Sequence, residues 1–287
     1  MANFDGAIDP KAWATSSIGD DPSVTLSELQ RGLTVSQIAT RRADFHTCLY
    51  NEDLSTVVVR NRSNNFDFLP VTNNDTIVGL LEIASFRNRP APDISVYTEM
   101  MPLSEEYVLG ADASILEFVR TADKQRCRLI VSGHQISALV SLSDLQQLPV
   151  RAALFGIITY LEMLLMKAIR AEHHGSESWI DRLPPKRQDK LNEEISKARS
   201  DNGFVDSLLF TQFADKKIIL RKSSCFPRSK TKIDEDLSRI EALRNNIAHA
   251  NEYASSPEAA CVACATVRLI DEWIKDLSDW MPTKLRS

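Results

Sequence analysis

The sequence predicts an α+β protein whose first half alternates short strands and helices and whose second half is helical. Two observations lead to this prediction. Short apolar runs bounded by turn residues recur as far as Leu145, which is typical of strands and hairpins. After Leu145 the apolar residues recur at the three- and four-residue spacing of helices. At 287 residues the chain is long enough for two domains. We expect a flexible extension at 1–23, a strand-containing module at 24–148 and a helical bundle at 149–287.

Composition narrows the class of protein. A net charge of −5 argues against a protein that coats nucleic acid with its whole surface, but it allows a local basic site. The five cysteines are scattered and odd in number, which favours a reducing compartment over a disulfide framework. Residues 1–23 lack a basic region followed by an apolar run, so no secretory signal is expected. The apolar segment 152–169 contains Glu162 and Lys167, which favours a buried helix over a membrane span. We therefore expect a cytoplasmic protein with no membrane partner.

The strand-containing module begins with short helical and strand-like pieces. Apolar runs at 66–72 and 76–81 surround an Asn-Asn-Asp turn and predict a β-hairpin. Residues 86–104 contain three prolines and predict a linker.

A second series of elements follows this linker. Asp112 or Ser114 would cap a helix, and strands are expected at 128–131 and 135–140 around a Ser-Gly-His turn. A further helix would open at Ser141.

The order of helix, strand, hairpin and strand thus occurs twice, roughly sixty residues apart. Internal repetition is a strong indicator of architecture. Over 69–81 in the first copy, and over 128–131 and 138–145 in the second, the residues resemble a tandem pair of CBS domains. That resemblance covers about 24–148. It implies a cleft between the two copies that binds an adenine nucleotide (AMP, ADP or ATP) as a regulatory ligand.

The family's phosphate and ribose motif is Thr or Ser, two residues, then Asp. Ser141 and Asp144 match this motif in the second copy, and a helix N-terminus there would favour an anionic ligand. The first copy has Glu82 and Ser85 at the matching positions. This departs from the motif, and Glu82 would repel phosphate. The alternative interpretation, left open by the sequence, is that Ser141 only caps a helix with Asp144 in its first turn.

The second half predicts a series of helices. They are expected over 152–169, 186–200, 206–213, 233–248 and from Pro257 onward. Glu162 lies within the apolar stripe of the first helix. It is either at the edge of the buried face or a buried acid that needs a partner, such as an Arg or a His.

Two residue pairs in these helices could suggest metal ligands. The adjacent His173 and His174 point about 100° apart on a helix. Cys261 and Cys264 have no second ligand pair. No metal site is expected from either pair.

One strongly basic run lies between these helices, with Phe226 among its cations. Its members are Lys216, Lys217, Arg221, Lys222, Arg228, Lys230 and Lys232. Cations around an aromatic ring suit single-stranded RNA, which needs charge along the backbone and a face for a base. The alternative is a solvated helix face and loop.

A compact set of polar residues ends the 233–248 helix: Arg244 and Asn245, followed by His249. Arg binds phosphate oxygens through its planar guanidinium, and His exchanges protons near neutral pH. The Arg-x4-His spacing also occurs by chance. Asn245 and His249 share a helix face, whereas Arg244 and His249 lie about 140° apart at 3.6 residues per turn.

The placement of these residues in a helical bundle, with an acid on its first helix, is similar to a HEPN domain over about 150–280. The resemblance implies a metal-independent endoribonuclease that acts as a homodimer through the helical bundle and needs no cofactor. Arg244, Asn245, His249 and Glu162 would form its catalytic site, as in toxin or antiviral-defence ribonucleases. The alternatives are a non-catalytic adaptor that binds RNA or protein, and a partner subunit of a nucleotidyltransferase.

Overall fold

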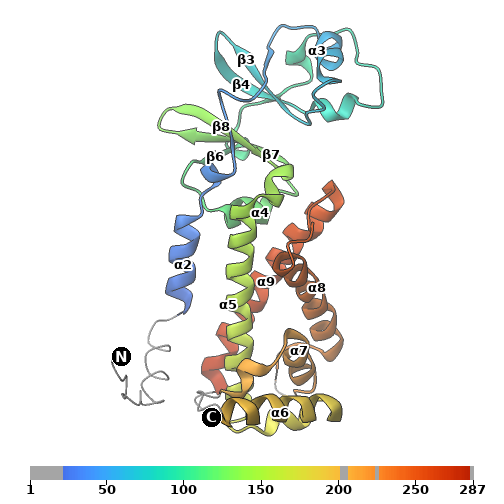
Figure 1. The fold of residues 1–287 in the computed structure, drawn as a ribbon. Coiled ribbons are helices and arrows are strands. Elements are labelled where there is room, and N and C mark those ends of the chain that lie inside the picture. Colours follow the sequence, from blue (N-terminus) through green and yellow to red (C-terminus); the bar gives the residue numbers. More distant parts are fainter. Residues whose placement is uncertain (1–21, 201–205, 224–225, 285–287) are drawn as a thin grey trace, which may run out of the picture. The chain divides into compact units, whose positions relative to one another are not determined.

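The computed structural model describes residues 22–200, 206–223 and 226–284 (Figure 1). The chain forms two compact units. The sheet unit comprises 31–150 and 254–264. The helical unit comprises the described parts of the remaining residues. Most of the extension expected at 1–23 lies outside the described residues.

The first sheet of the sheet unit has four strands. β2 (Cys48–Leu49) runs parallel to β3 (Leu69–Asn73), which pairs antiparallel with β4 (Thr76–Leu81). β5 (Met101–Pro102) pairs with the outer edge of β4. The hairpin predicted over 66–81 is confirmed. β5 arises from residues predicted as a linker, so that prediction is wrong for this part of the segment.

The second sheet has the same plan. β6 (Val108–Gly110) runs parallel to β7 (Cys127–Ser132), and β7 pairs antiparallel with β8 (Gln135–Ser141). β1 (Thr40–Arg41) pairs with the outer edge of β8. The second predicted hairpin is therefore confirmed. Gly133, with φ of 61°, supplies the left-handed turn conformation that a residue without Cβ adopts readily.

The two hairpins repeat with the same register. Val71 opposes Gly79 in the first and Ile130 opposes Ala138 in the second, which places both pairs 59 residues apart. A β-bulge follows at the same point in each. The two copies also exchange an edge strand. β1, which precedes the first copy in the sequence, joins the second sheet. β5, which precedes the second copy, joins the first sheet. The internal repeat predicted from sequence is confirmed.

In each copy one helix connects the two parallel strands in the sequence, and a side-chain N-cap fixes where this helix begins. Asp53 accepts the Thr56 amide at 2.9 Å and begins α3 (Leu54–Asn61). Ser114 accepts the Glu117 amide at 3.1 Å and begins α4 (Ile115–Thr121), as predicted.

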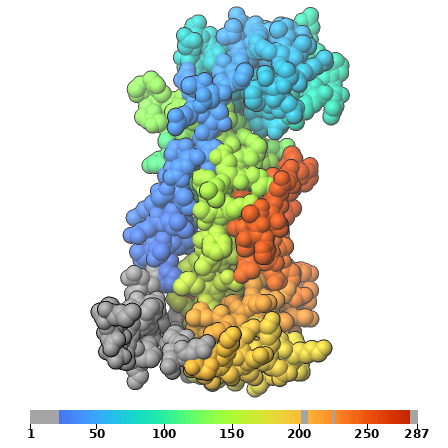
Figure 2. Space-filling model, in the orientation of Figure 1, coloured from blue at the N-terminus to red at the C-terminus, as the bar shows by residue number. Residues whose placement is uncertain are grey.

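The helical unit contains most of α2 (Pro22–Gly32) and of five helices that follow the sheet-forming segment. These five are α5 (Leu148–Glu172), α6 (Pro185–Ser200), α7 (Phe213–Arg221), α8 (Lys230–Ala248) and α9 (Pro257–Lys284). Residues 257–264 of α9 belong to the sheet unit. Residues 206–213, predicted as a helix, form only a short 3₁₀ turn at Ser207–Phe210. Figure 2 shows the residues of α6 in yellow beside those of α7 in orange.

Helix α5 forms the core of the helical unit. Leu154, Ile158, Leu161 and Leu165 are at most 1% exposed. By length and composition α5 is the one described helix that would also fit a membrane crossing, a test that the core helix of a globular domain passes as well. Gly156 lets α2 approach α5, since a Cβ there would lie 2.5 Å from Leu29 Cδ2. The chain is thus α+β, with the strands in one unit and the long helices in the other.

Candidate functional sites

The Arg-x4-His residues lie at the C-terminal end of α8. Arg244 and Asn245 are in its last turns, and His249 is the C-cap. The His249 amide donates to Asn245 O at 3.0 Å, so these two residues follow one another on the helix surface as predicted. Asn245 and His249 are exposed and Arg244 is half-buried, with its Nη1 3.2 Å from Asn245 Oδ1. Solvent therefore reaches the polar groups of this helix end.

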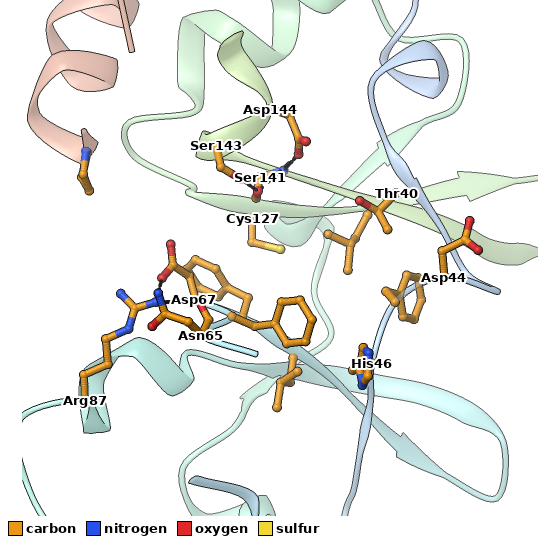
Figure 3. Close-up of a pocket in the computed structure, with 16 residues that line it drawn as sticks. Thr40, Asp44, His46, Asn65, Asp67, Arg87, Cys127, Ser141, Ser143 and Asp144 are labelled. Atoms are coloured by element: carbon orange, nitrogen blue, oxygen red, sulfur yellow. Dashed lines mark hydrogen bonds and ion pairs between the residues drawn. The ribbon is translucent and has the colours of Figure 1, made fainter. Parts of the chain in front are cut away.

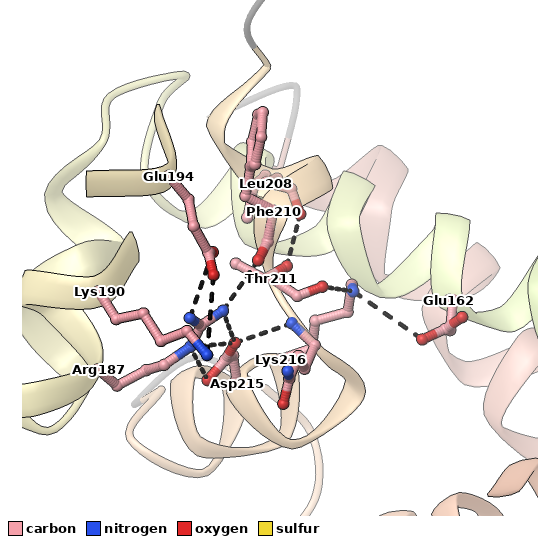
Figure 4. A network of polar contacts seen from close by, with 10 residues as sticks. Glu162, Arg187, Lys190, Glu194, Leu208, Phe210, Thr211, Asp215 and Lys216 are labelled. Atoms are coloured by element: carbon pink, nitrogen blue, oxygen red, sulfur yellow. Dashed lines mark hydrogen bonds and ion pairs between the residues drawn. The ribbon is translucent and has the colours of Figure 1, made fainter. Parts of the chain in front are cut away.

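A largely buried charge pair joins α5 and α7 near Arg244. Lys216 Nζ is 3.9 Å from Glu162 Oε1 and donates to Thr211 O at 2.9 Å (Figure 4). Burial lowers the pKa of Lys216, the carboxylates of Glu162 and Asp215 oppose this shift, and the nearby Arg244 cation adds to it. Of the two interpretations of Glu162, the structure therefore shows a partly buried acid with a partner, and this partner is Lys216 rather than an Arg or a His.

Most of the basic run points into the protein or pairs internally. Lys216 is 4% exposed, Lys217 Nζ lies 3.1 Å from Glu241 Oε2, and Lys222 Nζ donates to Arg182 O at 2.5 Å. These three cations therefore already have partners within the chain.

Arg228 and Lys232, in the later part of the run, also make contacts within the chain. Arg228 bonds to Asp236 at 2.7 Å and stacks on Trp273, which Phe226 also covers. Phe226 is 7% exposed, so it offers no face to a nucleobase. Lys232 Nζ lies 2.9 Å from Asp236.

Two cations of the run differ from the others. Arg221 and Lys230 are exposed and have no side-chain partner among the described residues. The RNA-binding hypothesis therefore narrows from seven side chains to these two.

The sheet unit holds a cavity of about 480 Å³ lined by both copies of the repeat. Ser141, Ser143 and Asp144 of the second copy line it, and the first copy contributes several polar side chains (Figure 3). Those contributions are Asn65, Asp67 and Arg87, with Thr40, Asp44 and His46 from the segment that precedes the first copy. Its volume lies within the range of small-molecule sites in proteins.

Ser141 and Asp144 form a capping box within this wall. Asp144 Oδ2 accepts the Ser141 amide at 2.7 Å, and Oδ1 accepts Gln147 Nε2 at 2.8 Å. Gln147 also donates to Ile38 O at 2.7 Å. Burial raises the pKa of Asp144, and these hydrogen bonds partly offset that shift. Ser141 and Asp144 therefore take part in the cap of the short 3₁₀ helix at Leu142–Gln146, and the same two side chains also line the cavity.

The first copy has no equivalent cap. Glu82 makes no side-chain cap bond, and Ser85 Oγ donates to Glu82 O at 2.9 Å. Arg87 pairs with Asp67 and donates to Asn65 O at 2.9 Å. The first copy thus departs from the motif at Glu82 and Ser85, and it also lacks the side-chain hydrogen bonds that cap the matching turn of the second copy.

Aromatic rings complete the cavity wall. Phe45, Phe66 and Phe68 line it, and the His46 ring lies 5.0 Å from that of Phe66. No sequence pattern identified these residues, because they come from separate segments that only the fold brings together. A flat ring system would find apolar faces there and hydroxyl and carboxylate groups at Ser141 and Asp144.

No group of three or more potential metal ligands occurs among the described residues. His173 is instead buried, with Nδ1 2.8 Å from Ser178 Oγ. Cys264 is buried and Cys261 half-buried on α9.

No protein-family model matches the sequence, and no curated protein matches it. The solved structures that are similar in part include several CBS-domain structures. The CBS domain of a bacterial CNNM/CorC family Mg²⁺ transporter in complex with ATP is 14% identical, with a TM-score of 0.38, covering 45% of this chain and 94% of that one.

Two further structures give comparable values. A hemolysin-like protein containing a CBS domain, from Oenococcus oeni, is 11% identical, with a TM-score of 0.34 and coverage of 44% and 96%. The CBS domains of a transcriptional regulator from Streptococcus pneumoniae are 15% identical, with a TM-score of 0.34 and coverage of 39% and 95%. At these TM-scores we draw no conclusion about either candidate site from the structural similarity.

Proposed function

We propose that this chain is a metal-independent endoribonuclease of the HEPN type, that it acts as a homodimer, and that an adenine nucleotide in the sheet unit regulates it. The observation that carries the proposal is the grouping of Arg244, Asn245 and His249 at one solvent-accessible helix end. The Glu162 and Lys216 pair lies near Arg244, close enough for the Arg244 cation to lower the pKa of Lys216.

The side chains at this helix end suit phosphodiester cleavage. His249 would take the proton from the ribose 2′-hydroxyl or protonate the leaving 5′-oxygen. Arg244 would stabilise the charge that develops on the phosphate, and Asn245 would orient His249 or contact a phosphate oxygen. Arg221 and Lys230 are the exposed cations of the basic run that would attract the RNA backbone.

A second copy of the chain would complete the site. Arg244 and His249 lie about 140° apart around the helix axis, so one substrate phosphate meets both more easily if two helix ends face each other. Phe155, four residues after Arg151 on α5, is 52% exposed. Arg151 bonds to the carbonyls around His249, so an apolar ring for a second copy to cover lies near the proposed site.

The cavity of the sheet unit would hold the regulator. Its aromatic rings suit an adenine base, Asp144 would meet the ribose hydroxyls, and Ser141 would meet a phosphate. Regulation requires that the nucleotide bind two states of the protein with different affinity. Calorimetry with AMP, ADP and ATP would test this assignment, with Asp144→Asn expected to weaken binding and Asp181→Asn in the helical unit as the control.

RNA cleavage by the purified full chain tests the proposed activity. We expect cleavage that persists in excess chelator and falls at least 100-fold in both Arg244→Ala and His249→Ala, an order of magnitude typical of lost acid–base or phosphate-stabilising groups. His174→Ala is a matched control, because His174 is also an exposed His at a helix C-terminal end. Loss of cleavage in chelator, or full activity of both variants, would contradict the proposal. RNA binding without cleavage would favour the non-catalytic adaptor.

A further inference from the structure

Arg151 is bonded to the turn that carries His249. It belongs to the first turn of α5, and its Nη1 donates to Asn246 O at 3.0 Å and to Ile247 O at 3.1 Å. Its Nη2 donates to Asn251 O at 2.9 Å. The guanidinium thus joins carbonyls on both sides of His249 in the sequence.

The location of Arg151 is unfavourable for its own helix. The N-terminal end of a helix carries partial positive charge, so a cation in the first turn is destabilising there. The C-terminal end of α8, by contrast, presents carbonyls that have no partner within the helix. Arg151 donates to two of these carbonyls, Asn246 O and Ile247 O, and places its charge at the negative end of the α8 dipole. The aromatic ring of Tyr253, 5.1 Å from the guanidinium carbon, further limits its position.

The turn itself has little freedom once these bonds form. The Asn251 amide donates to Asn246 O at 2.8 Å and the Ala250 amide to Ile247 O at 3.3 Å, the pattern of a Schellman motif. Ala250 occupies the left-handed position with φ of 55°, where glycine is usual. Because a non-glycine residue adopts this conformation unfavourably, the surrounding bonds have to hold it.

We propose that Arg151 is the positioning residue for His249: it fixes the turn at 246–251 so that the imidazole stands ready for proton transfer. This inference rests on the proposed ribonuclease function. Arg151 itself need not touch the substrate. A general base has to lie within hydrogen-bond reach of its proton, and a displacement of about 1 Å costs on the order of 100-fold in rate.

Kinetics of RNA cleavage distinguish positioning from simple structural support. Arg151→Gln is expected to lower kcat roughly 10- to 100-fold with little change in KM. Arg151→Lys should recover part of this loss, because one ammonium can satisfy some but not all of the three carbonyls. In a His249→Ala background, Arg151→Gln should have no further effect, since Arg151 acts only through His249.

The matched control is Arg170→Gln, which removes another partly exposed Arg of α5 that pairs with Asp206 away from the turn. It should leave kcat unchanged. Equal losses in both variants, or a full additional loss in the His249→Ala background, would overturn the positioning role.

Amide hydrogen exchange tests the same inference without any activity. Arg151→Gln should accelerate exchange at His249 and Asn251 while the core of α8 stays protected. Unchanged exchange there would overturn the inference. Accelerated exchange in a chain whose wild type cleaves no RNA would instead refute the ribonuclease proposal and limit Arg151 to holding the turn.

Discussion

Lys216 Nζ lies 3.9 Å from Glu162 Oε1 inside the helical unit, with only 6% of the Lys216 side chain exposed. Burial opposes the charge of Lys216 and lowers its pKa, while Glu162 supports the charged form. Glu162 is 20% exposed, so solvent screens the pair only in part. The pair is therefore a structural link between α5 and α7 close to Arg244.

Removing one partner of this pair should cost more than removing both. Glu162→Gln removes one of the two carboxylates that favour the charged form of the buried Lys216, so we expect a loss of about 1–3 kcal/mol in the free energy of unfolding. Glu162→Leu combined with Lys216→Met should recover most of that loss. Urea denaturation monitored by circular dichroism measures both. Lys190→Met, in an exposed pair with Glu194, is the control and should change stability by less than about 0.5 kcal/mol. An unaffected Glu162→Gln variant would show that the Thr211 carbonyl and the Asp215 carboxylate are enough to hold Lys216.

Asp236 should contribute more to stability than Asp276, although both bind Arg228. Asp236 is 4% exposed and also accepts from Trp273 Nε1 at 3.1 Å and from Lys232. Asp236→Asn leaves the half-buried Arg228 with an incomplete set of acceptors, and we expect a loss of about 2–4 kcal/mol. Asp276 is 36% exposed, so Asp276→Asn should have a smaller effect because water replaces the lost contact. Thermal unfolding of the two variants gives the comparison. Equal losses would contradict the central role of Asp236.

The raised pKa of Asp144 leads us to expect that the free energy of unfolding depends on pH in a specific way. Its folded-state pKa is raised by burial, so the folded protein retains a proton that the unfolded chain loses first. The stability contributed by Asp144 is therefore present below the unfolded pKa near 3.8 and is lost as pH rises through the raised folded pKa. The stability of the wild type relative to Asp144→Asn should fall over this window. Urea titrations of both proteins from pH 3 to pH 7 measure the difference. A constant difference would mean that the capping bonds cancel the effect of burial.

The sequence predicted the parts of the fold that depend on local patterns. Both hairpins follow from apolar runs around turn residues, and the Ser114 cap from its place before an apolar helix. The exchange of β1 and β5 between the sheets was not predictable, because each strand has two residues and pairs with a distant partner. Helix α3 contains three consecutive valines that would favour a strand, and the Asp53 cap and tertiary packing override that preference.

The candidate sites were predicted only where a motif is continuous in the sequence. The residues at 244–249 and at 141–144 belong to such motifs, whereas Arg151 is fixed by carbonyls about a hundred residues away. The sequence of the basic run shows which residues are charged, but it does not show which of these side chains point into the protein and which face solvent. Helical spacing could have identified one exception: Phe213, Lys216 and Leu220 share the buried face of α7.

Ala250 provides a test of the turn that holds His249. Its φ of 55° is unfavourable for a residue with a Cβ, so Ala250→Gly should raise the free energy of unfolding by roughly 1 kcal/mol. Ala248→Gly is the matched control, because Ala248 is the last residue of α8 with helical backbone and should lose up to about 1 kcal/mol. Urea denaturation of both variants measures the opposite signs. If Ala250→Gly were destabilising, the left-handed conformation at the end of α8 would be wrong, and so would the Schellman turn that presents the 246, 247 and 251 carbonyls to Arg151.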